Sequence, residues 1–230
     1  MMKLTTFVLF TILAIIINQG QDDYRRLRED MVKTQIEARN VYDRATLKAM
    51  RTVPRHEFVP EHMQAYAYQD RPLSIGNGQT ISQPYIVAFM TSVIKPKPDD
   101  RILEIGTGSG YQAAVLAEIV QSVYTIEIIP ELADKAKAKF ESLNYSNIYT
   151  RTGDGYHGWP EEAPFDAIVV TAAPDEIPEP LIEQLKEGGK LVIPVGPKYS
   201  VQSLQLLTKK NGDTSIKNLF PVRFVPFTRD

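Results

Sequence analysis

A glycine-rich turn, Glu104-Ile105-Gly106-Thr107-Gly108-Ser109-Gly110, separates a short apolar run from a longer apolar segment. The run before it, Arg101–Ile105, has the length of a buried strand, and the segment after it, Tyr111–Ile119, is a helix candidate. Glycines between a strand and a helix permit a tight turn and let the backbone approach a ligand closely. This stretch therefore predicts a strand–turn–helix unit with a ligand site at the turn.

The spacing of the glycines distinguishes between classes of cofactor. A dinucleotide fingerprint needs its third glycine three positions after the second, and this chain has Tyr111 at that position. Gly106, Gly108 and Gly110 instead follow the G-x-G-x-G spacing that is usual for S-adenosylmethionine. That cofactor has no pyrophosphate, so it does not need a dense anion site at the start of the helix. The turn predicts an S-adenosylmethionine site, with a ligand-free strand–helix turn as the alternative.

Strands alternate with helices around this unit. Strands are expected at Arg101–Ile105, Ser122–Ile126, Asn147–Thr150, Phe165–Thr171 and Lys190–Pro194, and helices at Tyr111–Ile119, Pro130–Leu143 and Pro178–Leu185. Such alternation predicts a parallel sheet that is covered by helices on both faces. Two late strands, Ser203–Lys209 and Leu219–Val225, flank the hairpin signal Asn211-Gly212. They would add an antiparallel edge to the sheet.

The region before residue 99 has a different pattern. Residues 22–51 read as helical, residues 71–84 form a loop rich in turn formers, and a helix begins after Pro84 and stops before Pro96. We therefore expect an α/β fold, a doubly wound Rossmann-like methyltransferase sheet with N-terminal helices. A single domain over residues 21–230 would comprise a helical and substrate-loop region (21–98), a cofactor-binding core (99–195) and C-terminal strands (196–230).

Two carboxylates follow the next two predicted strands. Glu127 ends the second strand, 21 residues after Gly106, and a carboxylate at that place accepts hydrogen bonds from both ribose hydroxyls. Asp154, followed by Gly155, comes just past the third strand, where it can receive an adenine amino group. The glycine turn, Glu127 and Asp154 all lie at the carboxyl ends of strands, where open α/β sheets bind ligands. The alternatives are a solvated charge for Glu127 and an ordinary Asp-Gly turn for Asp154.

Composition narrows the possible partners. The 230 residues carry a net charge of −2, without the basic excess typical of nucleic-acid enzymes. There is no cysteine, so the chain has no disulfide, thiolate metal site or cysteine nucleophile. His56 and His62 lack a third ligand at metal-binding spacing. We therefore expect neither a nucleic-acid partner nor a metal.

The first 20 residues have the pattern of an export signal. Lys3 precedes an apolar run from Leu4 to Ile17, and Asn18-Gln19-Gly20 follows. The run of about 14 residues is short for a membrane span of ~20 but suits a signal-peptide core. An uncleaved anchor or a buried helix is the alternative. We expect an exported or periplasmic protein if the leader is a signal peptide, and a cytoplasmic one otherwise.

The chain resembles the protein-L-isoaspartate O-methyltransferase family over roughly residues 25–228. The similar segments are Val53–Pro60, Tyr68–Asp70 with Pro72-Leu73, Gly78–Pro84, Leu103–Gln112, Gly153–Gly155, Pro164–Ile168, Leu185–Gly189 and Pro194–Gly196. Gln79–Pro84 is specific to this family, whereas the glycine turn is shared with most methyltransferases. The leader is a departure, because members are usually cytosolic.

This resemblance implies repair of aged proteins. The family methylates the α-carboxylate of isoaspartyl residues, and the ester then cyclises unaided and can reopen as normal aspartate. Ser82 matches the serine assigned to the active site, and Thr228 matches a threonine that contacts the cofactor. The alternative for Ser82 is a helix N-cap, since Ser82-Gln83-Pro84 also fits that pattern. The loop Ile75–Gly78 is expected to close over the cofactor with Gly76 and Gly78 as hinges, and Val222–Val225 to offer backbone hydrogen bonds to an extended peptide.

The expected site combines one catalytic residue with a set of cofactor-binding residues. The catalytic candidate is Ser82, and the residues expected to bind S-adenosylmethionine are Gly76, Gly78, Ser82, Glu104, Gly106, Gly108, Gly110, Glu127, Asp154, Gly155 and Thr228. No general base is needed, because a carboxylate acceptor with a pKa near ~4 is already ionised at neutral pH.

Expected partners are isoaspartyl-containing proteins and peptides, with no stable membrane contact after leader removal and a monomeric enzyme. Two alternative functions remain at this point. One is a methyltransferase with another acceptor, such as a small molecule or RNA. The other is an exported cofactor-binding module without activity, because S-adenosylmethionine is made in the cytosol.

Overall fold

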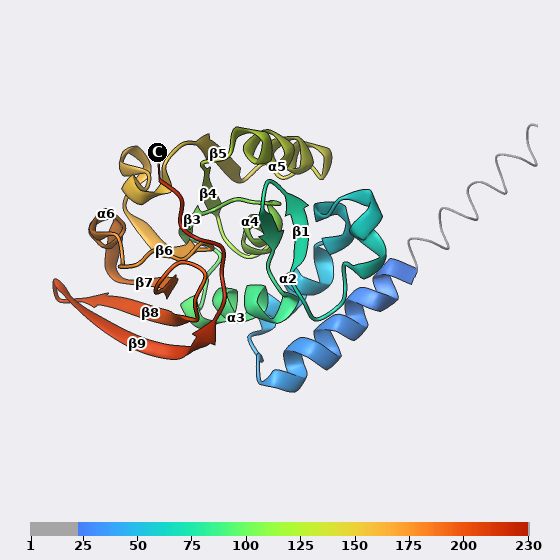
Figure 1. Cartoon of the computed structure of the whole chain (residues 1–230). Helices are drawn as coiled ribbons and strands as arrows, with labels where there is room; N and C mark the ends of the chain where they lie inside the picture. Colours follow the sequence, from blue (N-terminus) through green and yellow to red (C-terminus); the bar gives the residue numbers. More distant parts are fainter. Residues whose placement is uncertain (1–22, 230) are drawn as a thin grey trace, which may run out of the picture.

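A seven-stranded sheet forms the centre of the protein in a computed structural model that describes residues 23–229 (Figure 1). The leader predicted for residues 1–20 lies outside the described residues. The sheet has the order β5-β4-β3-β6-β7-β8-β9. Its strands are β3 (Arg101–Ile105), β4 (Ser122–Glu127), β5 (Ile148–Thr152), β6 (Phe165–Val170), β7 (Leu185–Val195), β8 (Gln202–Lys210) and β9 (Asp213–Val222). The strands from β5 to β7 are parallel, and β8 and β9 are antiparallel, which confirms the predicted α/β sheet with an antiparallel edge.

Alternate residues of the central strands pack into two separate cores. In β3, Ile102 belongs to the core shared with α3 (Pro84–Ile94), α4 (Tyr111–Ala117) and α5 (Pro130–Ser142). Leu103 and Ile105 belong to the core on the other face, shared with α6 (Glu179–Glu183). Successive side chains of a strand point to opposite faces, so an almost continuously apolar strand can support helices on both sides.

The chain changes direction across the sheet at β3. From β3 it continues through α4 to β4 on one side, whereas β6 pairs with the other side of β3. A crevice opens at such a switch point, outside the carboxyl ends of the strands. The glycine turn follows β3 directly, so the topology places it at this crevice.

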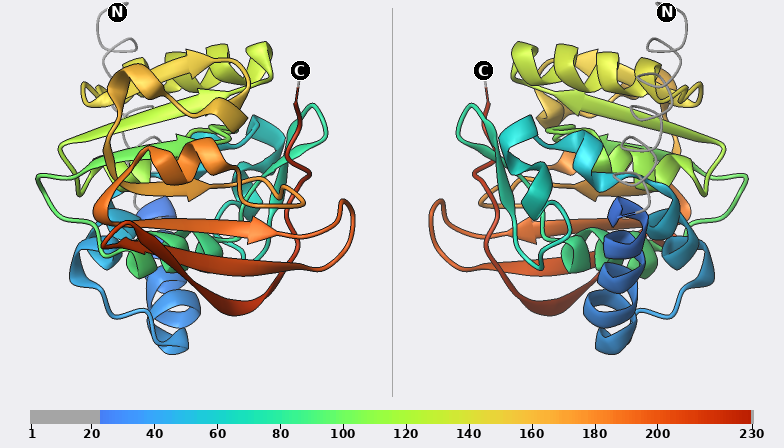
Figure 2. Two further views of the ribbon diagram at one scale, coloured as in Figure 1. Left: turned by 90° about the vertical axis from the view of Figure 1, so that its left-hand side faces the viewer. Right: turned by 90° about the vertical axis from the view of Figure 1, so that its right-hand side faces the viewer.

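The antiparallel edge differs in its bounds from the prediction. Asn211 and Gly212 form the expected two-residue turn, with φ of 56° and 80°. Pairing resumes at once on the far side, with Lys210 opposite Asp213, so the predicted strand Leu219–Val225 was wrong in where it begins and ends. The first six residues of β9 are exposed, and this lack of apolar alternation concealed the strand. Figure 2 shows β9 at the outer edge of the sheet.

The predicted helix over residues 22–51 is interrupted. The chain is helical over residues 23–39, including η1 (Val32–Ile36) and η2 (Glu37–Arg39), and stops at Asn40 with a left-handed φ of 67°. Helix α2 (Arg44–Thr52) then begins at Asp43, whose side chain accepts a hydrogen bond from the N–H of Thr46. An Asp at this position is a strong helix start. The connector that follows forms η3 (Arg55–Phe58) and η4 (Glu61–Tyr66).

The predicted loop over residues 71–84 contains a hairpin. Strands β1 (Leu73–Gly76) and β2 (Gln79–Ile81) pair around Asn77 and Gly78, whose φ values are 50° and 70°. Asn-Gly is a strong signal for a two-residue turn with two positive φ angles, but the flanking strands are too short to show alternation. The helix expected after Pro84 is confirmed as α3, which ends at Lys95 with a left-handed φ of 56°.

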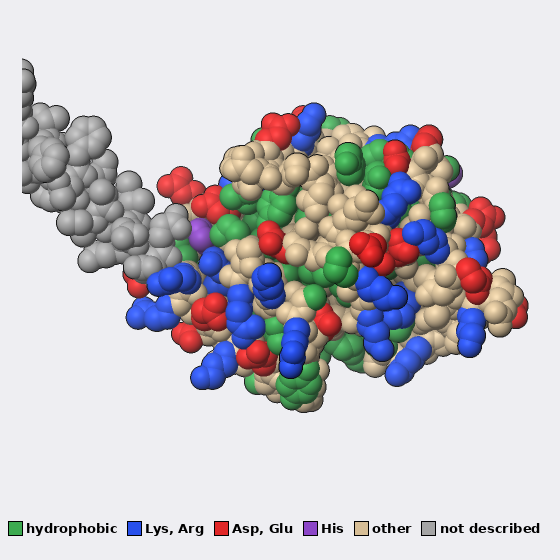
Figure 3. Space-filling model, turned by 180° about the vertical axis from the view of Figure 1, so that it is seen from behind, with side chains coloured by type: hydrophobic (Ala, Val, Ile, Leu, Met, Phe, Trp, Pro, Cys, Tyr) green, Lys and Arg blue, Asp and Glu red, His purple; other side chains and the backbone are tan. Residues whose placement is uncertain are grey.

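The face opposite that of Figure 1 carries acidic and basic side chains side by side (Figure 3). Hydrophobic side chains show on it only in small separate areas. Among residues 23–229, no helix is both long enough and apolar enough to cross a bilayer.

Candidate functional site

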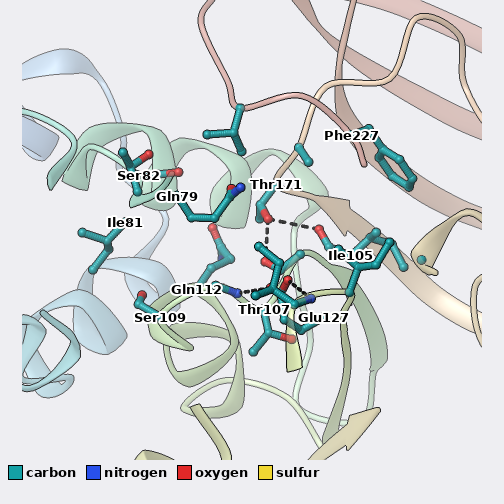
Figure 4. A pocket seen from close by; sticks show the side chains of 18 of the residues that line it. Gln79, Ile81, Ser82, Ile105, Thr107, Ser109, Gln112, Glu127, Thr171 and Phe227 are labelled. Carbon is teal, nitrogen blue, oxygen red and sulfur yellow. Dashed lines mark hydrogen bonds between the residues drawn. The ribbon is translucent and has the colours of Figure 1, made fainter. Parts of the chain in front are cut away.

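A pocket with about 790 Å³ of empty space, part of it open to solvent, lies at the carboxyl ends of the central strands. Residues from the glycine turn, the end of β4, the β1–β2 hairpin and the last segment of the chain line it. Figure 4 shows Ser82, Gln79 and Ile81 on one side of the pocket and Phe227 on the opposite side. Two segments that are far from the central strands in sequence therefore close the crevice predicted by the topology.

The glycine turn is held tightly against the ends of two neighbouring strands. The N–H of Gly106 donates to the carbonyl of Ile126 at 2.8 Å, and the hydroxyl of Thr171 donates to the carbonyl of Gly106 at 2.6 Å. Gly106 has φ of 93°, and a Cβ there would stand 2.4 Å from the Thr171 Oγ1. Gly110 has φ of 87°, and its Cβ would stand 2.6 Å from the ring of Phe140. Both positions therefore require glycine for space as well as for backbone conformation.

Glu127 lines the pocket with a carboxylate that the main chain holds in place. Its Oε2 accepts a hydrogen bond from the N–H of Gly108 at 2.7 Å, and its Oε1 accepts one from the N–H of Ile129 at 3.0 Å. Each carboxylate oxygen can accept a second hydrogen bond. The side chain is thus oriented before any ligand arrives and can still accept from a pair of hydroxyls.

Glu104 lies beneath the pocket and is not among the residues that line it. Its Oε2 accepts a hydrogen bond from the Thr125 hydroxyl, which contacts the Thr107 hydroxyl at 2.6 Å. Its Oε1 has no partner among the described residues. Burial raises the pKa of Glu104 to about 8, although the hydrogen bond from Thr125 acts in the opposite direction. Of these residues, only Thr107 lines the pocket, so Glu104 reaches the site through two threonines.

Asp154 has its carboxylate engaged by other parts of the protein. Its Oδ1 accepts from the N–H of Tyr156 at 2.9 Å, and its Oδ2 accepts from Arg229 at 2.8 Å. Burial acts to raise the pKa of Asp154, but the bonds from Tyr156 and Arg229 hold it below the ordinary value. Gly155 lines the pocket, whereas Asp154 is not among the lining residues. The pocket wall near the end of β5 is therefore formed by the neighbouring glycine.

A second, larger groove adjoins the first pocket. Ile86, Arg223 and Phe224 are among the residues that line only the groove. Thr80, Ser82, Thr171, Val225 and Pro226 line both. Ser82 thus stands where the two spaces meet.

The hydroxyl of Ser82 is not used to cap the following helix. Gln83 occupies the N-cap position of α3 without a side-chain cap bond, and Pro84 is the first helical residue. The N-cap alternative for Ser82 is therefore wrong. Within residues 23–229, the Ser82 hydroxyl forms no hydrogen bond, so it remains available to a ligand.

The β1–β2 hairpin reaches across the cofactor side of the site. The side-chain amide of Asn77 donates to Glu131, in the first turn of α5, at 3.0 Å. A Cβ added to Gly108 would lie 3.6 Å from the Ile75 side chain, so the hairpin lies close to the glycine turn. Gly78 lines the groove, whereas Gly76 lines neither space.

The final segment of the chain forms the other wall. Its backbone is anchored by bonds between the Ala173 N–H and the Val225 carbonyl and between the Phe227 N–H and the Ala173 carbonyl, both at 2.9 Å. The N–H of Phe224 donates to the side chain of Gln202. Part of the backbone predicted to bind peptide is therefore already bonded within the protein. Thr228 lines the first pocket.

Sequence reasoning missed several residues that line the pocket. Thr171 and Phe227 are two examples. Thr171 directly follows β6, which ends one residue before the predicted strand Phe165–Thr171 does, and the rule that sites form at the ends of neighbouring parallel strands could have found it. Phe227 had no local signal. Among residues 23–229 there is no cluster of three or more His, Cys, Asp or Glu side chains suited to a metal ion.

Comparison with known proteins shows a match over almost the whole chain. The family model for protein-L-isoaspartate(D-aspartate) O-methyltransferase matches residues 25–230. A protein-L-isoaspartate O-methyltransferase of Opitutus terrae is 57% identical over 222 residues, which cover 95% of each chain.

Two solved structures are similar to the chain. One, a protein-L-isoaspartate O-methyltransferase, has 33% identity and a TM-score of 0.78 over 86% of this chain, and this chain spans 65% of its length. Another, a Plasmodium falciparum protein described as a putative member in complex with S-adenosyl-L-homocysteine, has 29% identity and a TM-score of 0.75 over 90% of this chain and 99% of that one.

Proposed function

The chain belongs to the protein-L-isoaspartate(D-aspartate) O-methyltransferase family, and we propose that its two adjoining spaces hold the two substrates, with Ser82 at the point of transfer. The first pocket would hold the methyl donor, and the groove would hold the damaged peptide. Only five residues line both spaces, and all other lining residues belong to one space alone. This separation supports the division.

The reaction is methyl transfer from S-adenosylmethionine to the α-carboxyl of an isoaspartyl residue. A carboxylate oxygen forms the new bond to carbon, the bond from carbon to sulfur breaks, and its electron pair remains on sulfur. The products are a neutral ester and S-adenosylhomocysteine. Of the two alternatives, transfer to another acceptor and an inactive binding module, neither is favoured by the similarity to this family over the whole chain.

The lining of the first pocket fits S-adenosylmethionine in its chemistry. When bound, the cofactor supplies a sulfonium that makes its methyl group electrophilic. We assign Glu127 to the two ribose hydroxyls, because its carboxylate is oriented by Gly108 and Ile129 and keeps free acceptor capacity. Apolar side chains such as Ile128 and Phe227 are placed to cover an adenine ring.

The protein's task at the acceptor is alignment. The acceptor carboxylate is ionised at neutral pH with a pKa near ~4, so the protein does not need to remove a proton. Holding two reactants at about 3 Å in the right direction removes much of the barrier to transfer. We assign to the Ser82 hydroxyl the hydrogen bond that orients the attacking carboxylate.

The observation that carries this assignment is the uncommitted Ser82 hydroxyl at the junction of pocket and groove. The test compares S82A with the unmodified enzyme on an isoaspartyl peptide and on its normal aspartyl twin. We expect S82A to lower kcat on the isoaspartyl peptide about 10-fold, the range of one lost hydrogen bond to a charged group, and to leave S-adenosylhomocysteine affinity unchanged. Unchanged kcat in S82A would refute the role of Ser82, whereas equal methylation of both peptides by the unmodified enzyme would refute the proposed division of substrates.

We also propose that residues 1–20 are an export signal and that the mature enzyme is a monomer without stable membrane contact. The apolar run Leu4–Ile17 behind Lys3 supports export. Sequencing of the mature N-terminus together with cell fractionation tests the signal, and sedimentation tests the monomer. An intact leader on protein in the cytosolic fraction would overturn the export proposal.

A further inference from the structure

Arg55 is a fully buried cation that is joined to the backbone of Ser82. It begins η3, and the residue has 0% of its surface exposed. Its Nε donates to the carbonyl of Ala67 at 2.7 Å, and its Nη2 donates to the carbonyl of Ser82 at 2.8 Å. One rigid side chain therefore ties together three segments: η3, the end of η4 and the junction between β2 and α3.

The guanidinium of Arg55 lacks an acidic partner in the part of the chain that the structure describes. Among residues 23–229, no Asp or Glu forms an ion pair with it, and its Nη1 has no hydrogen-bond partner. Its other close contact is the ring of Tyr111, 4.9 Å from the guanidinium carbon. Burial lowers the pKa of Arg55 to about 10, so the side chain is still charged at neutral pH.

Stability alone does not explain such a residue. Moving a charge out of water costs several kcal/mol, and replacing buried charges by apolar side chains of similar volume is often neutral or stabilising. Hydrogen bonds to two carbonyls and the contact with one aromatic ring offset only part of that cost. This buried charge has no acidic partner among the described residues, and it is bonded to the backbone of Ser82, which lines both spaces. That arrangement, beside a site whose acceptor is an anion, points to a role in the reaction.

Arg55 also contacts the cofactor side of the site. Tyr111 is the first residue of α4, directly after the glycine turn, and it lines the cofactor pocket. Its fully buried ring contacts both the Arg55 guanidinium and the ring of Phe58. Arg55 therefore touches one residue of each half of the site, Tyr111 on the cofactor side and Ser82 on the acceptor side.

We propose that Arg55 is a positioning residue for methyl transfer: it fixes Ser82 relative to the glycine turn, and its uncompensated charge attracts the acceptor carboxylate to Ser82. The proposal rests on the role proposed for Ser82. In a water-poor interior, the field of an unpaired charge is weakly screened and extends to neighbouring groups. The substrate then brings the negative charge that the protein itself does not provide.

Lysine could serve only one of these two roles. A guanidinium presents several donors in a fixed planar fork, whereas an ammonium is a compact point charge. The two carbonyls of Ala67 and Ser82 belong to different segments and are bonded by two different nitrogens of Arg55. R55K should therefore keep the attraction for the carboxylate but lose part of the alignment.

The test uses an isoaspartyl peptide whose flanking residues are uncharged. In R55M and R55K it measures kcat and KM for this peptide and the Kd of S-adenosylhomocysteine. Because S-adenosylhomocysteine is a zwitterion without net charge, its affinity depends less on the Arg55 charge than the affinity of an anionic acceptor does. We expect R55M to raise the peptide KM and lower kcat, each about 10-fold, with the Kd within about 3-fold. R55K should bring the peptide KM back close to that of the unmodified enzyme, but its kcat should stay close to that of R55M. If R55M fails to fold, R55K still tests the proposal, because it should change kcat much more than the peptide KM.

R51M is the matched control. Arg51 pairs with Glu29 and Glu37 at 2.9 Å on the N-terminal helices, and neither ion pair touches the site. We expect R51M to lower the melting temperature while leaving the peptide KM and the Kd of S-adenosylhomocysteine unchanged. If R55M and R55K behave like R51M, with lower stability and an unchanged peptide KM, Arg55 is merely structural and the proposal fails. An unmodified enzyme that ignores isoaspartate would instead refute the proposed function.

Discussion

The glycines of the cofactor turn and those of the β1–β2 hairpin have similar backbone angles but different surroundings. Gly106 and Gly78 have φ of 93° and 70°. A Cβ at Gly106 would collide with Thr171, whereas a Cβ at Gly78 would meet nothing within 4 Å. The glycine turn is therefore shaped by close packing, whereas the tip of the β1–β2 hairpin at Gly78 is shaped by backbone conformation without close packing. Only the second kind of structure can move without rebuilding the core.

The largest effect is expected for G106A. The added methyl group would stand 2.4 Å from the Thr171 hydroxyl, and alanine at positive φ costs a further ~1–2 kcal/mol. Relief requires breaking the bonds from Thr171 to the turn. We expect loss of measurable S-adenosylhomocysteine binding by calorimetry and a lower melting temperature. G188A, at another positive φ but in open space, is the control, and equal behaviour of the two variants would show that close packing at Gly106 is not what requires glycine there.

The second effect concerns the carboxyl sealed under the cofactor turn. Glu104 has a pKa of about 8 in the folded protein against an ordinary 4.5. The unfolded chain therefore loses this proton near pH 4.5, while the folded protein keeps it until about pH 8. The folded state binds more protons in that window, so the stability contributed by Glu104 is complete below pH 4.5 and is lost as pH rises to 8.

E104Q removes this dependence, because an amide does not titrate. We expect the free energy of unfolding of E104Q relative to the unmodified enzyme to rise with pH by on the order of a few kcal/mol. Denaturant melts of both proteins at pH 5 and pH 8 measure the difference. Parallel curves would mean that Glu104 is ionised and that the cofactor half is less tightly sealed than we describe.

The third prediction concerns a ligand contact rather than packing. E127Q keeps the shape of the side chain and some acceptor capacity but removes the charge next to the Gly108 N–H. We expect S-adenosylhomocysteine affinity to fall about 10-fold, as for one charge-assisted hydrogen bond, with kcat at saturating cofactor nearly unchanged. E131Q, at the Asn77 contact and outside the pocket lining, should change affinity much less. A large fall in kcat for E127Q would contradict a purely binding role.

The smallest effect is expected for G78A and G78N. Nothing obstructs either side chain, so only the positive φ is penalised, by about 1 kcal/mol for alanine and less for asparagine. We expect S-adenosylhomocysteine affinity within about 3-fold of the unmodified enzyme for both. G78N should be closer to it than G78A. A loss as large as that of G106A would show that the hairpin is packed like the cofactor turn.

The same contrast explains what could be predicted from the sequence. The strands from β3 to β7 and the glycine turn follow from local apolar runs and their spacing, and β3 was predicted to the residue. Glu127 follows from topology, since it ends a parallel strand beside the turn. These features depend on short-range patterns, which survive in a single sequence.

Other parts of the site depend on contacts between distant residues. Asp154 is engaged by Arg229, 75 residues later in the chain, and Ser82 is held by Arg55, 27 residues earlier. Neither pairing has a local signal. The β1–β2 hairpin was missed although Asn77-Gly78 has the same turn chemistry as Asn211-Gly212, because its strands are only four and three residues long.

The exposed edge strand β9 affects how the protein interacts with the damaged proteins that it methylates. Damaged proteins present loosened segments, and an open sheet edge is a template on which such segments can add as further strands. β9 carries charges at Asp213 and Lys217 and lacks an N–H at Pro221, near the groove. These residues discourage edge-to-edge association. These features therefore protect an enzyme that binds damaged chains from aggregating with them.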